Sequence, residues 1–383
     1  MERRTFLRTA VVGAGAAVAF GGSLWREAFA YPALPGPSPY GPLQPADANG
    51  IMLPQGFTSR VIARSGQQVS GTNHTWHNAP DGGACFADGT GWIYVSNAEV
   101  GGGGGGVSAV KFSSTGAIVG AYSILSGTNS NCSGGATPWN TWLSCEEVSL
   151  GYVYETDPWG VNAAVRRPAM GRFKHEAAAA DPDRKVIYMT EDEPDGCFYR
   201  FVPTTWGDLS SGTLQVLTES GGVLSWVNVP DPDGSPTATR KQVSTAKKFN
   251  GGEGCYYTAG KCYFTTKGDN RVWAYDAVNN TLAIVYDDNV SGAPLTGVDN
   301  ITSARSGDLF VAEDGGNMEI CVITPDDIVA PFLRVTGQSS SELCGVAFNP
   351  AGDRLYFSSQ RGTTGTSSGG ITYEVTGPFR TTA

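Results

Sequence analysis

Acidic side chains recur along this chain at the places where short apolar strands begin and end. Glu176, Glu253 and Asp299 each stand just before such a strand, and the thiol Cys132 takes the same place in an earlier repeat. Carboxylate oxygens are hard ligands that suit Ca²⁺, whereas a thiolate is a softer ligand that favours a transition metal. The chemistry that these residue types offer together is metal binding.

Repeated strand-and-turn units would position these side chains. The first two strands of the units occupy residues 77–97, 132–146, 176–191, 253–267, 299–313 and 344–360. Each unit continues into a further strand, at 107–112, 152–155, 197–202, 271–276, 319–323 and 371–375. Repeats of three or four short strands are typical of propeller blades. Six units in phase argue against an open pair of sandwiched sheets.

We therefore predict an all-β fold, a six-bladed β-propeller closed by an N-terminal strand. That strand is the run at 57–63, which would complete the last blade. Closing the ring in this way removes exposed strand edges. The 52 glycines and 22 prolines agree with many short strands joined by tight turns.

Propeller geometry gathers the recurring residues at one face of the ring. The first strand of a blade lies nearest the axis and the second returns antiparallel, so the start of one and the end of the other share a face. The strand starts contribute Cys132, Glu176, Glu253 and Asp299, and the strand ends contribute Glu146, Glu147, Glu191, Asp192, Lys267, Asp269, Glu313 and Asp314. Two carboxylates about 4 Å apart repel by about 1 kcal/mol in water, and by several-fold more where water is excluded. A single acid here can be a turn cap, but a ring of them predicts bound cations.

The N-terminal segment has the features of an export signal. Arg3 and Arg4 form a twin-arginine pair, an apolar run at 10–24 follows, and 28–30 is a small-x-small cleavage site. We expect residues 1–30 to be a twin-arginine signal peptide, 31–50 a Pro-rich extended arm, and 51–383 a single propeller domain. A core helix or a membrane anchor is the alternative for the apolar run. If these residues are an export signal, the twin-arginine machinery is a partner of the protein. We then expect a periplasmic, cell-surface or secreted location, with no membrane span in the mature protein.

The charge balance excludes two classes of partner. The whole chain has a formal charge of -10, and the signal segment contributes four arginines against two glutamates, so the mature chain is near -12. Nucleic acids and anionic membranes both need basic surfaces. We therefore expect no nucleic acid as partner, and we expect a monomer.

Four motifs resemble those of the PhoX-type alkaline phosphatases. Residues 131–147 read NCSGGATPWNTWLSCEE, and 171–177 read GRFKHEA; residues 190–203 read TEDEPDGCFYRFVP, and 313–316 read EDGG. The resemblance extends through nearly all of the mature chain. It implies a propeller whose axial site holds iron and calcium (Fe³⁺ and Ca²⁺) and hydrolyses phosphate esters.

The resemblance also implies roles for individual residues. Carried over by position, Cys132 would be an iron ligand, and Glu176, Glu253 and Asp299 would be bridging or terminal carboxylates. Calcium would be held by the acids at strand ends, namely Glu146 or Glu147, with Glu191, Asp192 and Glu313.

One departure concerns phosphate binding. Family members usually read Arg-Pro-Glu-Gly where residues 251–254 read Gly-Gly-Glu-Gly. An arginine offers phosphate a planar, bidentate contact that Gly251 lacks. Lys267, at the same mouth, is a point-charge substitute, and Arg361 in the last unit is a second candidate. These two are our candidate catalytic residues.

Two classes of function follow. The first is a metal-dependent hydrolase of phosphate esters. The second is a calcium-bound propeller that acts as a binding module, or as a lactonase-type hydrolase without phosphatase activity. Cys132 discriminates between them, because a lactonase site needs no thiolate.

Overall fold

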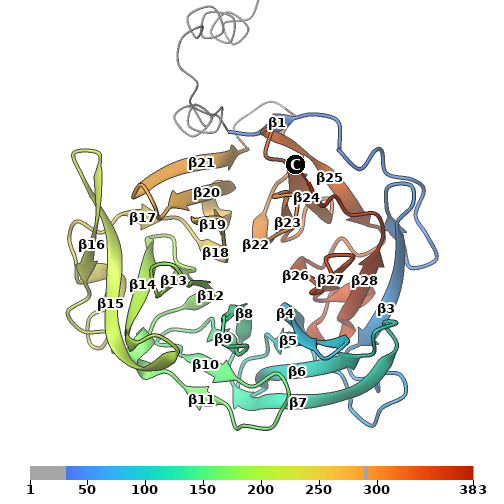
Figure 1. The fold of residues 1–383 in the computed structure, drawn as a ribbon, viewed down its shortest axis with the longest axis horizontal. Coiled ribbons are helices and arrows are strands. Elements are labelled where there is room, and N and C mark those ends of the chain that lie inside the picture. Colours follow the sequence, from blue (N-terminus) through green and yellow to red (C-terminus); the bar gives the residue numbers. More distant parts are fainter. Residues whose placement is uncertain (1–31, 289–291, 383) are drawn as a thin grey trace, which may run out of the picture. The chain divides into compact units, whose positions relative to one another are not determined.

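The computed structural model describes residues 32–288 and 292–382, so the predicted signal peptide at 1–30 lies outside the described residues. The described chain folds into six sheets set around a central axis (Figure 1), and it contains strands and short 3₁₀ helices only. Consecutive strands within each blade pair antiparallel, as in a propeller. The predicted six-bladed, all-β fold is confirmed.

Each blade contains at least four strands, taken in order from the axis outward. The first three blades are β4(Pro80–Asp88), β5(Gly91–Ala98), β6(Gly105–Phe112), β7(Ile118–Thr128); β8(Asn131–Ala136), β9(Trp142–Glu146), β10(Val153–Thr156), β11(Val165–Arg166); and β12(His175–Asp181), β13(Val186–Glu191), β14(Gly196–Thr205), β15(Asp208–Ser220), β16(Val223–Asn228), with β17(Lys248–Phe249) beside β14. The last three are β18(Gly252–Thr258), β19(Lys261–Thr266), β20(Arg271–Asp276), β21(Thr281–Asp287); β22(Val298–Ser303), β23(Leu309–Glu313), β24(Glu319–Ile323), β25(Ile328–Val335); and β26(Leu343–Phe348), β27(Arg354–Ser359), β28(Ile371–Thr376), β3(Thr58–Arg64).

The segment before β3 runs along the fifth blade. β1(Leu34–Pro35) pairs with β25 in parallel, and β2(Ile51–Met52) pairs with it antiparallel.

The 3₁₀ helices of the described residues are short: η1(Pro168–Met170), η2(Thr239–Lys241), η3(Lys267–Asp269), η4(Gly362–Thr364) and η5(Ser367–Gly369). Within the described ranges, no helix has the length and apolar character needed to cross a bilayer.

β3 closes the ring as predicted. It pairs with β28 from Thr58↔Thr376 to Arg64↔Ile371, so the N-terminal strand and the C-terminal strand share one blade. Beside it, the ring of Phe57 packs at 5.2 Å from that of Phe332 and at 5.0 Å from that of Phe379. Burying each such aromatic side chain contributes about 1.5–3 kcal/mol. Packing between the blades therefore reinforces the closure.

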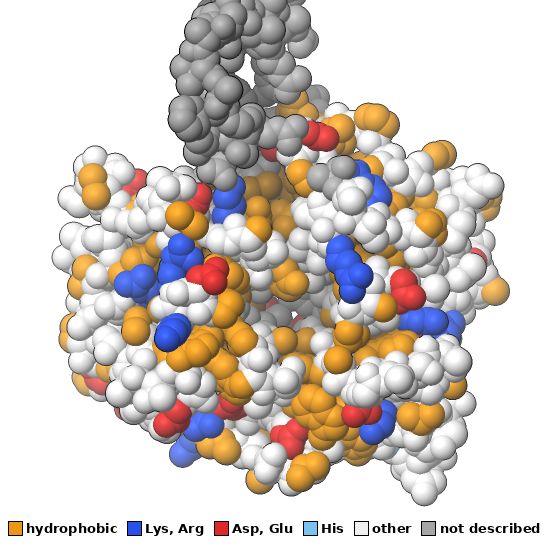
Figure 2. Space-filling model, viewed as in Figure 1, with side chains coloured by type: hydrophobic (Ala, Val, Ile, Leu, Met, Phe, Trp, Pro, Cys, Tyr) orange, Lys and Arg blue, Asp and Glu red, His pale blue; other side chains and the backbone are white. Residues whose placement is uncertain are grey.

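Small residues let the six innermost strands approach the axis. A Cβ on Gly82 would lie 2.5 Å from the Cα of Ser133 in the next blade, and one on Gly135 would lie 1.8 Å from the carbonyl oxygen of Ala178. Any larger residue would push neighbouring blades apart. The strands leave an axial cavity of about 250 Å³ whose walls include Gly134, and the drawn face of the ring is hollowed at its centre (Figure 2).

Candidate metal centre

A β-bulge near the start of each innermost strand creates the site. The inner hairpins begin with the ladder pairs Pro80↔Ala98, Asn131↔Glu146, His175↔Glu191, Gly252↔Thr266, Val298↔Glu313 and Leu343↔Ser359. In five blades the register shifts directly after this pair, and in the sixth one residue later. A bulge leaves the extra residue outside the ladder and re-aims its side chain.

The residues that follow these pairs form two rings, one position per blade. On the first strands they are Asp81, Cys132, Glu176, Glu253, Asp299 and Cys344, which we call the inner ring. On the second strands they are Glu99, Glu147, Asp192, Lys267, Asp314 and Gln360, which we call the outer ring. The repeat of the fold thus becomes a repeat of functional side chains.

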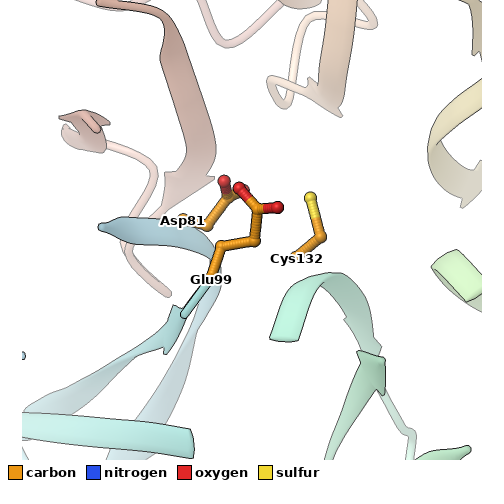
Figure 3. A group of neighbouring side chains, drawn as sticks. All are labelled: Asp81, Glu99 and Cys132. Atoms are coloured by element: carbon orange, nitrogen blue, oxygen red, sulfur yellow. The ribbon is translucent and has the colours of Figure 1, made fainter. Parts of the chain in front are cut away.

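Seven of these residues form one continuous group, the axial cluster. Potential ligand atoms lie within 4.8 Å of one another in three overlapping sets: Asp81, Glu99 and Cys132; Cys132, Glu147 and Glu176; and Glu176, Glu253 and Asp299. Figure 3 shows the first set, with both carboxylates and the thiol directed into one space. The structure therefore brings together Cys132, Glu147, Glu176, Glu253 and Asp299 of the predicted ligands.

Five predicted metal ligands are not part of the axial cluster: Asp192 and Asp314 belong to the outer ring but to none of the three ligand sets, and Glu146, Glu191 and Glu313 belong to neither ring. The Glu146 carboxylate accepts two backbone N–H groups at 2.9 and 3.1 Å, and the Glu313 carboxylate accepts two at 2.8 and 2.9 Å. Glu191 accepts the Tyr199 hydroxyl at 2.8 Å and pairs with Arg240 at 3.2 Å. Each of these glutamates is the first of two consecutive acids in the sequence. The first carboxylate accepts hydrogen bonds from its own part of the fold, and the second acid (Glu147, Asp192 or Asp314) belongs to the outer ring.

Glu313 also lies within 4.8 Å of Glu319 and Cys321, away from the predicted set. In this group the Arg334 guanidinium donates to Glu319 Oε1 at 2.9 and 2.5 Å. An internal cation thus already serves the Glu319 carboxylate.

Three cationic side chains pair with acids at the mouth. Lys267 lies 3.0 Å from Glu253 and 3.2 Å from Asp314, so the predicted catalytic lysine is in contact with the axial cluster. Arg361, the other candidate, lies 2.9 Å from Glu342. The third cation, Lys174, is 2.9 Å from Glu147 and also contacts Asp192.

Sequence reasoning missed several residues of this site. Asp81 and Glu99 were not proposed, and neither was Gln360, whose amide donates to both carboxylates at 2.6 Å. A signal for Asp81 was present, because two glycines follow it, as Ser-Gly-Gly follows Cys132. The predicted first unit, 77–97, starts four residues before Asp81 and ends two residues before Glu99, so it was placed too early in the chain at both ends.

Burial makes the axial cluster electrostatically strained without cations. Burial, and then the nearby Glu99, raises the pKa of Asp81 to about 8 and that of Glu147 to about 7. Burial also raises the pKa of Glu253 to about 8, although Lys267 opposes the rise. For Glu176, burial and then the neighbouring acids raise the pKa well above its ordinary value.

The cluster fits a metal centre by its donors. Glu176 Oε2 is buried and has no hydrogen-bond partner, while Glu176 Oε1 accepts the Cys132 thiol at 3.3 Å. An orphaned buried carboxylate oxygen is costly unless a cation or donor reaches it. Carboxylates suit calcium, and a metal that binds the thiol would also deprotonate it. The residues present therefore fit both a hard cation and an iron ion.

Stability of the chelator-treated protein should fall as the pH rises. Because Asp81, Glu147 and Glu253 have folded pKa values of about 7 to 8, above their ordinary values near 4, the folded state holds protons that the unfolded state has released. Stability is then fully present below about pH 4 and is lost as the pH rises through about 8, by up to about 1.4 kcal/mol per pH unit for each group. Urea unfolding of metal-free protein across this range measures the slope, and saturating calcium should abolish it. A metal-free stability that rises with pH would contradict this electrostatic account.

The arrangement of the described chain defines a class of protein. The chain is a β-propeller with a buried cluster of carboxylates and one thiol on its axis, and this arrangement is typical of a metalloenzyme centre. The family model for alkaline phosphatase PhoX matches residues 94–362, well over half of the chain. The chain belongs to the PhoX alkaline phosphatase family and is a metal-dependent phosphoric ester hydrolase.

Three solved structures resemble the chain to different degrees. Pseudomonas fluorescens PhoX in complex with vanadate, a transition state analogue, is 17% identical, with a TM-score of 0.72 over 88% of this chain and 97% of that chain. A Xanthomonas campestris gluconolactonase is 14% identical, with a TM-score of 0.48 over 89% and 99%. A protein of unknown function from Bacteroides thetaiotaomicron is 9% identical, with a TM-score of 0.51 over 84% and 76%. No curated protein sequence matches the chain.

Proposed function

We propose that the axial cluster holds calcium and iron and hydrolyses phosphate esters at the mouth of the propeller. The observation that supports this best is the orphaned Glu176 carboxylate oxygen, buried between the Cys132 thiol and the carboxylates of Glu253 and Asp299. Metal ions bound here would supply Lewis-acid polarisation of a phosphoryl oxygen.

The donors divide by hardness. Cys132 offers the soft ligand that favours iron, and Glu176 shares one ligand set with Cys132 and another with Glu253 and Asp299. The all-oxygen set of Glu176, Glu253 and Asp299 and the carboxylates of Asp81 and Glu99 suit calcium. We assign no ligand role to Glu146 and Glu191, because backbone and side-chain donors already engage their carboxylates.

Lys267 and Arg361 are proposed to stabilise phosphate. Both stand at the mouth, and neither side chain is fully buried. The Lys267 ammonium lies 3.0 Å from Glu253, a proposed metal ligand, so it would stand beside a phosphoryl group that binds metal there. A positioned cation of this kind offsets charge that develops on the oxygens in the transition state.

The missing arginine has a local backbone explanation. Gly251 has a φ of 70°, a left-handed conformation that side chains rarely adopt, and a Cβ there would lie 3.3 Å from Asp192 Oδ1. The position borders the outer ring, so an arginine would point at the mouth only at a backbone cost. We therefore propose that phosphate binding in this chain depends on Lys267 and Arg361 instead.

We further propose that the protein works outside the cytoplasm. The twin-arginine pair and the cleavage site in residues 1–30 support export of folded protein, with residues 31–50 as an arm and 51–383 as a single monomeric domain. Such a route suits a protein that acquires its metals while folding.

The test is hydrolysis of p-nitrophenyl phosphate by purified protein with and without metal. We expect turnover at neutral to alkaline pH that EGTA removes and added calcium restores, and no turnover of gluconolactone. Retention of full activity after complete chelation, or lactone hydrolysis without phosphatase activity, would contradict the proposal.

A further inference from the structure

A third cation, Lys174, stands at the mouth beside the two candidate catalytic residues. Its ammonium bridges two blades, at 2.9 Å from Glu147 Oε1 in the second blade and in contact with Asp192 in the third. The side chain is 31% exposed, close to the 37% of Lys267 and the 34% of Arg361. All three cations therefore lie between the buried cluster and solvent.

All three cations belong to the outer ring or stand directly beside it. Lys174 pairs with the outer-ring residues Glu147 and Asp192. Lys267 is itself an outer-ring residue and lies 3.2 Å from Asp314, and Arg361 directly follows Gln360. Glu99 is an outer-ring member of the axial cluster, with Asp81 and Cys132 as its neighbours. Lys174 directly precedes β12 of the third blade, Lys267 follows β19 of the fourth, and Arg361 follows β27 of the sixth.

Metal loading changes what these cations can bind. Lys174 and Lys267 pair with carboxylates, Glu147 and Glu253, that are also cluster ligands. With metal ions bound by those carboxylates, the ammonium groups would lose much of their attraction and would face like charge. An anion placed between metal and ammonium removes this repulsion. A phosphate dianion presents several oxygens and can meet the metals and the cations together.

We propose that Lys174, with Lys267 and Arg361, binds the non-bridging oxygens of the substrate and selects dianionic phosphomonoesters over monoanionic diesters. The inference rests on the proposed phosphatase function and adds to it a specificity-determining residue, Lys174. A diester has one charge fewer and an additional alkyl or aryl group where the third cation stands. Loss of Lys174 should therefore affect monoesters far more than diesters.

The test compares Lys174→Ala with wild type in binding orthophosphate. Both proteins are loaded with calcium and iron, their metal content is measured, and phosphate affinity is determined by calorimetry. A charge-assisted hydrogen bond lost to phosphate should raise Kd about 10-fold or more. Lys174→Arg should retain most of the affinity. Lys111→Ala removes a comparable lysine, 2.7 Å from Asp88 and 40% exposed on the first blade, and should change nothing.

The substrate class is tested in the same proteins. The ratio of kcat/KM for p-nitrophenyl phosphate to that for bis-p-nitrophenyl phosphate should fall about 10-fold in Lys174→Ala, mainly through KM. If wild type binds phosphate and Lys174→Ala binds it equally well at equal metal content, Lys174 is only a counter-ion and the inference is overturned. If metal-loaded wild type itself neither binds phosphate nor hydrolyses either ester, the proposed function fails as well.

Discussion

Replacing Glu253 with alanine is expected to lower kcat/KM for p-nitrophenyl phosphate by at least about 10³-fold. Glu253 is the inner-ring residue of the fourth blade, is buried, and belongs to the all-oxygen set with Glu176 and Asp299. Its loss removes a proposed ligand and also the partner that holds Lys267 at 3.0 Å. Removal of a single transition-state donor already reduces rates about 10²–10³-fold, and disturbing the metals removes more.

Two further variants separate this effect from loss of fold. Glu253→Gln keeps the shape of the side chain and removes its charge, and it should lose nearly as much activity. Glu219→Ala removes a carboxylate that pairs with Lys247 far from the axis, on the outer strand β15, and should keep wild-type activity. Circular dichroism checks that all variants fold. Wild-type rates in metal-loaded Glu253→Ala would show that the axial cluster is not the active site.

The propeller could be predicted because its signals are local. Strands flanked by Gly and Asp turns recur along the chain, and the further strands expected at 271–276 and 319–323 coincide with β20 and β24. The closing strand at 57–63 could be predicted because it stands at the start of the mature chain, where a propeller can take the strand that completes its last blade. None of these inferences depends on a side-chain orientation.

The choice between neighbouring acids could not be made from sequence. Glu146 and Glu147 differ in function because Glu146 is paired in the ladder with Asn131, while Glu147 follows the last ladder pair. A one-residue shift reverses the face of every side chain, and the bulges occur at this point. Sequence patterns contain no mark for such bulges, so both acids of each doublet remained candidates.

The first blade illustrates the same limit. His77 and Asn97 bound the predicted first unit, yet neither belongs to the axial cluster. The Asn97 amide donates to the carbonyl oxygens of Cys132 and Ser133 at 3.1 and 2.8 Å, and the His77 ring packs on Trp76. The acids that reach the axis, Asp81 and Glu99, each lie a few residues further along the chain. Lys174 was missed for a different reason. It precedes β12 and so lies outside both strands of the β12–β13 hairpin, and its long side chain extends to the mouth.

Replacing Cys132 with serine is expected to remove iron from the protein while leaving calcium bound. The Cys132 thiol joins two of the three ligand sets of the axial cluster and is its one soft donor among the described residues. Burial and then the nearby carboxylates raise the pKa of the Cys132 thiol. A thiolate is therefore expected here only when a bound metal ion offsets its negative charge. Serine keeps the size and a weak oxygen donor, and the carboxylates that suit calcium are untouched.

Metal analysis of natively exported, undialysed protein tests the central claim most directly. The wild type should contain both iron and calcium and absorb visible light, and Cys132→Ser should contain calcium with iron at background. Cys145→Ser, which removes an equally buried thiol from β9 outside the cluster, should keep both metals. Calcium without iron in the wild type, or iron retained in full by Cys132→Ser, would contradict the assignment of this axial cluster as an iron–calcium centre.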